Sequence, residues 1–348
     1  MLVNAYSTLV KEQPDPGCAA GPVQRRGLLV AASDPGDRPR AEPQLAAHLA
    51  ELADYARAAT ADQPPAAGRA VADHLRRTMW QYAFQWDQAD PAQLTGWARQ
   101  ANAILYLEGG NLVDPDGGSL LACGADGMPL GRVPLRADAL ARATAVREAL
   151  QDKGITVAAS LPPSRVVGEV LTQPVREAGL RILALALVAD FSQSVLAGAP
   201  IDPARMWQAY PRAMTGFTPE EDRLFRTWDR DAAYQLSWRS EAADILLWAT
   251  ARAPLDFPRA QRDPRETFGT IFTGTEDEFV AATTLRPVHE LLAEQERARG
   301  LLWAIQQAEL AGGPPVRGVD GGVVLERLIA LTWLLDWRVD WDDVDTSS

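Results

Sequence analysis

The sequence predicts an α+β protein, with a small mixed N-terminal domain over residues 1–130 and a larger all-helical domain over residues 131–348. A chain of 348 residues exceeds one ordinary core and suits two domains of about 150 residues each. Strand-like segments occur only before residue 124, and helical periodicity dominates the rest. Hydrophobic residues make up 47% and charged residues 23% of the chain, which is typical of a globular protein.

Two strands, two helices and a hairpin are expected in the N-terminal domain. Short apolar runs predict strands over 3–9 and 27–32, and apolar residues at helical spacing predict helices over 41–59 and 68–87. Segment 101–123 predicts a hairpin, because Asp114-Pro115-Asp116-Gly117 has the composition of a tight turn between two apolar segments.

Segment 124–136, with its prolines and glycines, is the predicted linker, and helices follow it. They are expected over 137–153, 173–196, 219–248 with a break near Asp229, 287–310 and 323–337. The start at Thr218-Pro219-Glu220-Glu221 is the clearest. Thr218 suits the N-cap, Pro219 suits the first helical position, and Glu221 completes a capping box.

The charge and the apolar pattern restrict the partners. A net charge of −12 repels phosphate and anionic lipid, so we expect no nucleic acid and no membrane partner. The longest apolar run, 182–189, is far shorter than the roughly 20 residues of a bilayer span. The first ten residues do not resemble a signal peptide, and two distant cysteines suggest no disulfide framework. We therefore expect a cytoplasmic protein.

Several kinds of chemistry lack the residues they need. Lys11 and Lys153 are the only lysines, so any Schiff-base or phosphate-loop lysine must be one of these two. His48, His74 and His289 have no metal-ligand spacing, and each is expected to be a surface residue or a satisfied core residue. We predict no metal and no cofactor.

Several motifs of the helical domain occur together in an order known from one bacterial family. They are Leu161-Pro162-Pro163 with Glu177-Ala178 and Arg181, Trp238-Arg239-Ser240-Glu241-Ala242 with Leu246-Leu247-Trp248-Ala249, and Val324-Leu325-Glu326-Arg327 with Ala330-Leu331, Trp333, Trp341-Asp342 and Asp345-Thr346. In this order they resemble the family called domain of unknown function 4272, over residues 137–346. The resemblance implies a bacterial, all-helical bundle and no assigned reaction.

The chain departs from that family at two positions. Members often carry a histidine before the tryptophan of the penultimate helix and another after the closing Glu-Arg pair, where this chain has Leu302 and Leu328. Any chemistry that those histidines share would be missing here.

Charged residues embedded in apolar helices are the first candidates for a site. These are Glu177, Arg181, Arg239, Glu241, Glu326 and Arg327. Buried charges need partners, so they predict either structural ion pairs that fix the helix packing or a pocket lined by arginines and carboxylates.

Aromatic and acidic residues toward the C-terminus are the other candidates. Eight of eleven tryptophans lie from Trp207 onward, and Trp238, Trp248 and Trp333 belong either to the core or to an aromatic pocket wall. The segment 340–343 reads Asp-Trp-Asp-Asp, which is similar to the acidic box of one class of terpene cyclase. We interpret it as a solvated, frayed tail.

Three functions follow from these patterns, and whether the protein is an enzyme stays open. The leading hypothesis is a non-catalytic binding or protein-interaction factor of the immunity or accessory type, whose partner is another protein. The alternatives are an enzyme that uses buried carboxylates and arginines of the helical domain, and a sensor that binds a small molecule in a Trp-lined pocket. If the charged residues converge on a cavity, the enzyme is favoured. A closed apolar cavity would favour the sensor, and an acidic surface over a solid core would favour the interaction factor.

Overall fold

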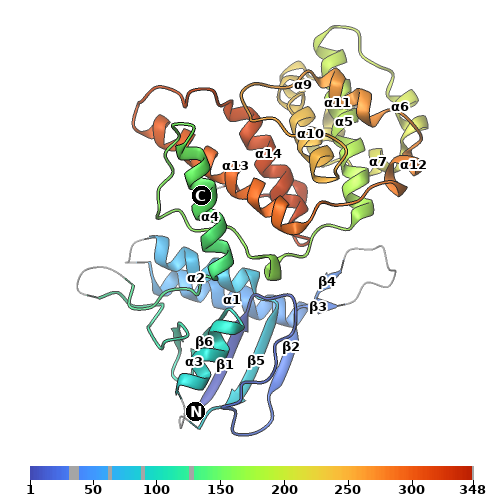
Figure 1. Ribbon diagram of the computed structural model, residues 1–348. Helices are drawn as coiled ribbons and strands as arrows, with labels where there is room; N and C mark the ends of the chain where they lie inside the picture. Colours follow the sequence, from blue (N-terminus) through green and yellow to red (C-terminus); the bar gives the residue numbers. More distant parts are fainter. Residues whose placement is uncertain (31–38, 62–64, 88–90, 125–128, 347–348) are drawn as a thin grey trace. The chain divides into compact units, whose positions relative to one another are not determined.

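The computed structural model describes residues 1–30, 39–61, 65–87, 91–124 and 129–346 (Figure 1). The chain divides into two compact units. The N-terminal unit contains Met1–Leu140 and Gly168–Val170, and the helical unit contains Ala141–Val167 and Leu171–Ser348. The first unit contains a small antiparallel sheet with helices, and the second unit is helical. The predicted α+β fold class is therefore confirmed.

The N-terminal unit is built on a five-stranded antiparallel sheet (Figure 1). Its order is β2 (Gln24–Gly27), β5 (Trp80–Gln85), β1 (Leu2–Ser7), β6 (Ala103–Leu107) and β7 (Asn111–Val113). A separate two-stranded ribbon pairs β3 (Leu29–Val30) with β4 (Arg40–Ala41).

Side-chain alternation gives this sheet two apolar faces, because successive residues of a strand point to opposite sides. Tyr6 and Ile104 belong to a core with the leucines of α1 (Pro43–Ala59) and α2 (Pro65–Arg77). Ala5 and Leu105 belong to the core on the other face, which α3 (Pro91–Gln100) covers with Leu94 and Trp97.

The helix expected over 68–87 is wrong in its second half, because α2 ends at Arg77 and β5 follows. Met79, Tyr82 and Trp86 fit a helical face, but the segment also places Tyr82 and Phe84 two residues apart, which is the period of a strand. Both side chains are buried in the core with Trp97, and pairing with β1 and β2 completes the backbone hydrogen bonds. Tertiary pairing therefore decides between the two periods.

The hairpin expected over 101–123 turns earlier than predicted. β6 returns as β7 through Glu108-Gly109-Gly110, where both glycines have positive φ. The predicted turn at Asp114–Gly117 also forms, with Gly117 N donating to Asp114 O at 3.1 Å, and it returns the chain to a single bridge between Val113 and Ser119.

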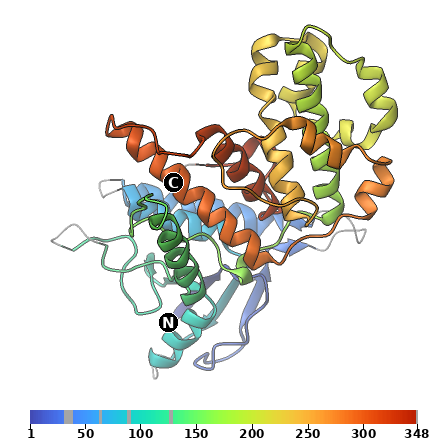
Figure 2. The same ribbon diagram turned by 45° about the horizontal axis from the view of Figure 1, so that its top comes forward.

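Several helices of the helical unit pack around one apolar helix, α5 (Val175–Leu196) (Figure 2). The other helices are α4 (Ala137–Gln151, whose first turn belongs to the N-terminal unit), α6 (Pro203–Ala209), α7 (Pro211–Thr215), α8 (Pro219–Thr227), α9 (Arg230–Leu236), α10 (Arg239–Ala249), α11 (Pro264–Ile271), α12 (Glu276–Ala281), α13 (Val288–Leu310) and α14 (Gly321–Leu334). Two 3₁₀ turns are η1 (Val167–Glu169) and η2 (Trp341–Asp343). By length and composition α5 could cross a membrane, but 72% of its apolar window is buried, which is the pattern of a core helix.

The predicted start of α8 is confirmed in detail. The Thr218 hydroxyl accepts from Glu221 N, and the Glu221 carboxylate accepts from Thr218 N at 3.0 Å. The predicted break near Asp229 is also present, between α8 and α9, and a second break at Ser237–Trp238, which was not predicted, separates α9 from α10. The short helices α3, α6, α7, α11 and α12 were not predicted, since each is too short to show a clear period.

Candidate functional site

Two arginines and two carboxylates meet inside the helical unit and form a chain of ion pairs. Arg181 on α5 donates from Nη1 and Nη2 to the two oxygens of Glu221 on α8, at 2.8 and 2.6 Å. Arg239 Nε on α10 lies 3.7 Å from Glu221 Oε1, and Arg239 Nη1 donates to both oxygens of Glu326 on α14 at 3.0 Å. We call these four residues the inner network.

An aromatic ring covers the inner network from the C-terminal segment. The Trp341 ring centroid lies 4.0 Å from the Arg181 guanidinium carbon and 5.7 Å from that of Arg239. Trp341 is 7% exposed and packs edge-on against Trp333. The expected frayed tail is therefore wrong at Trp341, because the indole finds two cations and an aromatic partner. The flanking Asp342 and Asp343 are exposed, as predicted.

The pKa values of the two carboxyls differ although both are buried. Burial would raise the pKa of Glu221, but the charge and hydrogen bonds of Arg181 outweigh it and hold this pKa below its usual value. Burial raises the pKa of Glu326, and Arg239 offsets the effect only partly. Glu221 is thus the firmly ionised centre of the network, with an arginine on either side.

A second pair of buried carboxylates lies on α10, three residues apart. Glu241 Oε1 accepts from Arg262 N at 2.6 Å, and Arg327 Nη2 lies 3.6 Å from Glu241 Oε2. Asp244 Oδ1 accepts from Arg262 Nη1 at 3.0 Å, and Asp244 Oδ2 lies 4.0 Å from Arg327 Nη2. We call Glu241, Asp244, Arg262 and Arg327 the α10 cluster.

The α10 cluster favours a protonated carboxyl near neutral pH. Burial raises the pKa of Glu241 to about 7, against the partial opposition of the Arg262 backbone N–H and the Arg327 charge. Burial also raises the pKa of Asp244. A carboxyl with such a pKa is suited to general acid–base chemistry if a substrate can reach it.

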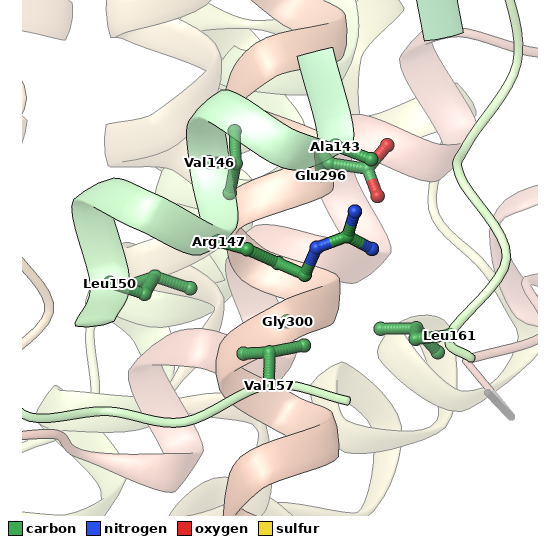
Figure 3. A pocket seen from close by; sticks show the side chains of 8 residues that line it. All are labelled: Ala143, Val146, Arg147, Leu150, Val157, Leu161, Glu296 and Gly300. Atoms are coloured by element: carbon green, nitrogen blue, oxygen red, sulfur yellow. The ribbon is translucent and has the colours of Figure 1, made fainter. Parts of the chain in front are cut away.

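Two pockets of the helical unit lie beside α4, and neither is lined by a residue of the inner network or the α10 cluster. The first, between α4 and α13, has a volume of about 10 Å³, which is room for one water molecule. Figure 3 shows Arg147 and Glu296 at its upper side and Val157 and Leu161 below. The second, of about 190 Å³, lies beside the loop 255–258.

The remaining predicted site residues are scattered through the helical unit. Glu177 is half-buried in the first turn of α5. Trp238 packs against α14, where a Cβ on Gly322 would lie 2.7 Å from its ring. Trp248 lies under the Arg286 guanidinium at 5.2 Å, and Trp333 contacts Trp341. These tryptophans fill contacts between helices and do not line either pocket.

The sequence reasoning missed four members of these groups. The sequence predicts Glu221 only as part of a capping box, and Trp341 only as part of a family motif and of the acidic tail. Asp244 follows Glu241 by three residues on a helix, which places the two on one face and was an available signal. Arg262 lies in a loop without a recognisable pattern, so no sequence signal pointed to it.

The N-terminal unit has a buried polar group of its own. His74 Nε2 lies 3.0 Å from Tyr6 O, and burial lowers the pKa of this histidine to about 4. Nearby, Glu169 accepts from the Asn102 side chain at 2.9 Å and from the Thr8 hydroxyl at 2.5 Å. His74 is therefore a neutral core residue rather than a surface residue, but within the described ranges its buried Nδ1 has no hydrogen-bond partner, so it is not the fully satisfied core residue that was predicted.

The comparisons with known proteins agree with the motifs of the helical unit. Within the described ranges, no group of three or more His, Cys, Asp or Glu side chains is arranged to hold a metal ion. Comparison with curated proteins and with solved structures gave no match. The model of one family, described as a domain of unknown function (DUF4272), matches residues 142–344, which is more than half of the chain. The chain therefore belongs to the DUF4272 family.

Proposed function

We propose that the protein is a non-catalytic binding protein, of the immunity or accessory type in a bacterial cell, whose helical unit engages a basic partner protein. The observation that carries this proposal is Trp228. Its side chain is 48% exposed, and its backbone has φ +56°, in the left-handed region that bulky residues rarely adopt. Strained backbone at an exposed aromatic residue is a pointer to function.

The fold holds Trp228 in place from three directions. Its indole N–H donates to Phe225 O at 3.1 Å, and its ring meets Phe191 of α5 edge-on at 6.3 Å. Arg230 donates to Val195 O and Leu196 O at the end of α5, which fixes the junction between α8 and α9. The exposed part of the ring is thus presented on a rigid support, which lowers the entropic cost of binding.

The surroundings of Trp228 fit a protein partner with positive charge. Tyr234 on α9 is 57% exposed, and Trp and Tyr are the residues most enriched at binding hot spots. Asp229 and Asp231 follow the tryptophan at the start of α9 and are exposed, as are the neighbouring Arg226 and Arg230. The negative charge that favours a basic partner is therefore the net −12 of the chain. Opposite charge on the partner would speed its approach and exclude acidic competitors.

The inner network supports binding rather than turnover. Its charges neutralise one another in the core and do not line either pocket beside α4. Buried ion pairs of this kind fix how helices pack, and α5, α8, α10 and α14 all contribute one side chain. A solid core is one part of the arrangement expected of an interaction factor.

A crosslinking experiment tests the proposal. A photoreactive phenylalanine analogue replaces Tyr234, and a matched variant carries it at Leu310, which is 82% exposed at the end of α13. In cells that express the protein naturally, we expect one adduct with a basic protein from position 234 and none from position 310. The purified partner should then bind the wild-type protein less tightly at high salt than at low salt. It should also bind the Trp228→Gly variant less tightly than the wild-type protein.

Two results would contradict the proposal. One is the same set of adducts from both positions, which indicates non-specific contact. The other is a partner whose affinity is unchanged by Trp228→Gly in a variant that retains its thermal midpoint.

A further inference from the structure

The larger of the two pockets beside α4 has a mixed lining that neither the core nor the aromatic surface explains. Its volume is about 190 Å³, and it lies where the end of α4 meets the loop 255–258 and α13. The apolar part of its lining includes Leu150, Leu255 and Phe257, and the charged part includes Lys153, Glu294 and Arg297.

Lys153 is the distinctive group of this pocket. It is one of two lysines in the chain, and its Nζ lies 5.2 Å from the centroid of the Phe257 ring. Within the described ranges it forms no ion pair with a carboxylate. In a protein of net charge −12, an ammonium without a carboxylate partner at the rim of a pocket is available to an anion.

The other charges of the lining limit how much negative charge the ligand can carry. Arg297 is paired with the buried Glu294, so this pair is close to neutral. Asp256 adds one carboxylate at the rim, while its backbone oxygen accepts from Arg327 at 2.7 Å. With two cations and two carboxylates, the lining is formally neutral, so it suits at most a monoanion such as a carboxylate and disfavours a phosphate dianion.

The size of the pocket restricts the apolar part of the ligand. An apolar cavity of about 150 Å³ is large enough for benzene, so about 190 Å³ admits one ring with a small substituent. The Phe257 ring and the two leucines supply the apolar contact for such a ring.

We propose that this pocket binds a small monocarboxylate that carries one aromatic or aliphatic ring, with the carboxylate on Lys153 and the ring against Phe257. The site is separate from the Trp228 surface and makes the helical unit a receptor for a small acid. The proposal does not depend on the partner protein, because binding is measured on the purified chain.

Benzoate is the probe, and benzamide is the uncharged compound of the same shape. We expect benzoate to bind the full chain with a Kd near 1 mM or below, on the order of what a small fragment with one ion pair achieves. Benzamide and Lys153→Gln should each weaken binding by about tenfold or more, and Lys153→Arg should retain most of it. Titration followed by NMR line broadening of the ligand measures all of these.

Lys11→Gln is the matched control, because it removes the other lysine, which is exposed in the N-terminal unit. It should leave benzoate binding unchanged. Lys153 also lies just beyond the C-terminal end of α4, where a cation stabilises the helix dipole. Thermal midpoints without ligand therefore accompany each titration, so that lost binding is interpreted only in a folded variant.

Three results would overturn the proposal. They are no benzoate binding by the folded wild-type protein at tens of millimolar, equal affinity for benzoate and benzamide, and equal benzoate affinity of wild type and Lys153→Gln. If Lys153→Gln fails to fold, Phe257→Ala serves as the second variant, and unchanged benzoate affinity there overturns the proposal equally.

Discussion

The Arg181 guanidinium lies between Glu221 and the face of Trp341, with its Nη atoms 2.6 and 2.8 Å from the carboxylate and its carbon 4.0 Å from the ring centroid. This arrangement joins the central helix α5 to the last turn of the chain. A buried cation is satisfied only if both its charge and its flat faces find partners. The C-terminal segment is therefore part of the core of the helical unit.

Removal of that ring should destabilise the helical unit. Trp341→Ala takes away a 7% exposed indole and opens Arg181 to water, so the free energy of unfolding should fall by about 3 to 5 kcal/mol. Urea denaturation followed by tryptophan fluorescence measures the change. Trp207→Ala, at a side chain that is 50% exposed, is the control and should cost less than about 1 kcal/mol. Equal losses for the two variants would contradict the role of Trp341.

The Arg181–Glu221 pair should show strong coupling in a double-mutant cycle. Arg181→Met alone leaves Glu221 buried without its bidentate partner and should cost about 3 to 5 kcal/mol. Glu221→Gln keeps a side-chain oxygen at the α8 cap. In the double variant, the loss in free energy of unfolding should be smaller than the sum of the two single losses by at least about 1 kcal/mol. Additive losses would show that the two side chains act independently.

The two units should respond to mild acid in opposite directions. The folded-state pKa of Glu241 is raised to about 7, so its stabilising effect is full below the unfolded value near 4.5 and is lost as pH rises through 7. The folded-state pKa of His74 is lowered to about 4 from the unfolded value of 6.5. Its contribution to the stability of the N-terminal unit is therefore full above pH 6.5 and is lost as pH falls toward 4. Between pH 7.5 and 5.5, the helical unit should gain stability and the N-terminal unit should lose it.

Hydrogen exchange resolved by peptide mass spectrometry, corrected for the intrinsic pH dependence of exchange, measures each unit separately. Glu241→Gln should remove the gain in the helical unit, and each effect should be at most about 3 kcal/mol. Parallel changes in both units would contradict these assignments. In stronger acid the helical unit should also lose stability, because Arg165 and Arg338 overcome burial and hold the pKa of Asp336 below its usual range.

Trp228→Gly should separate the backbone strain from the aromatic contact. Glycine adopts φ +56° without penalty, which recovers about 1 kcal/mol, while the loss of a half-exposed ring costs a similar amount. We therefore expect the free energy of unfolding to change by less than about 1 kcal/mol. Trp228→Val introduces a β-branched residue at the same position and should be clearly less stable than the glycine variant. Equal thermal midpoints for the two would argue against strain at this residue.

Two glycines offer a matched test of the packing of Trp238 against α14. In Gly322→Ala the new Cβ would lie 2.7 Å from the Trp238 ring, so we expect a loss of about 1 to 3 kcal/mol. In Gly269→Ala, on α11, the Cβ meets no atom within 4 Å, and the helix should gain about 0.5 to 1 kcal/mol. Thermal denaturation of both variants checks the opposite signs.

The sequence by itself determined the features that depend on neighbouring residues. The α8 start follows from Thr218, Pro219 and Glu221, because a capping box is completed within four residues. The long helices α5 and α13 follow from composition over twenty or more positions. The separation into a mixed and a helical region followed in the same way, since strand and helix periods differ along the chain.

Only the tertiary structure decided which charged residues meet. Arg181, Arg239 and Glu326 were candidates. Glu221, which pairs with both arginines, and Trp341, which covers them, come from other segments of the chain. The same holds for β5, where pairing with β1 and β2 overrode a plausible helical face. Local sequence fixes the local conformation, whereas ion pairs and strand pairs depend on which surfaces the fold brings within a few ångströms, and that distance is a property of the whole chain.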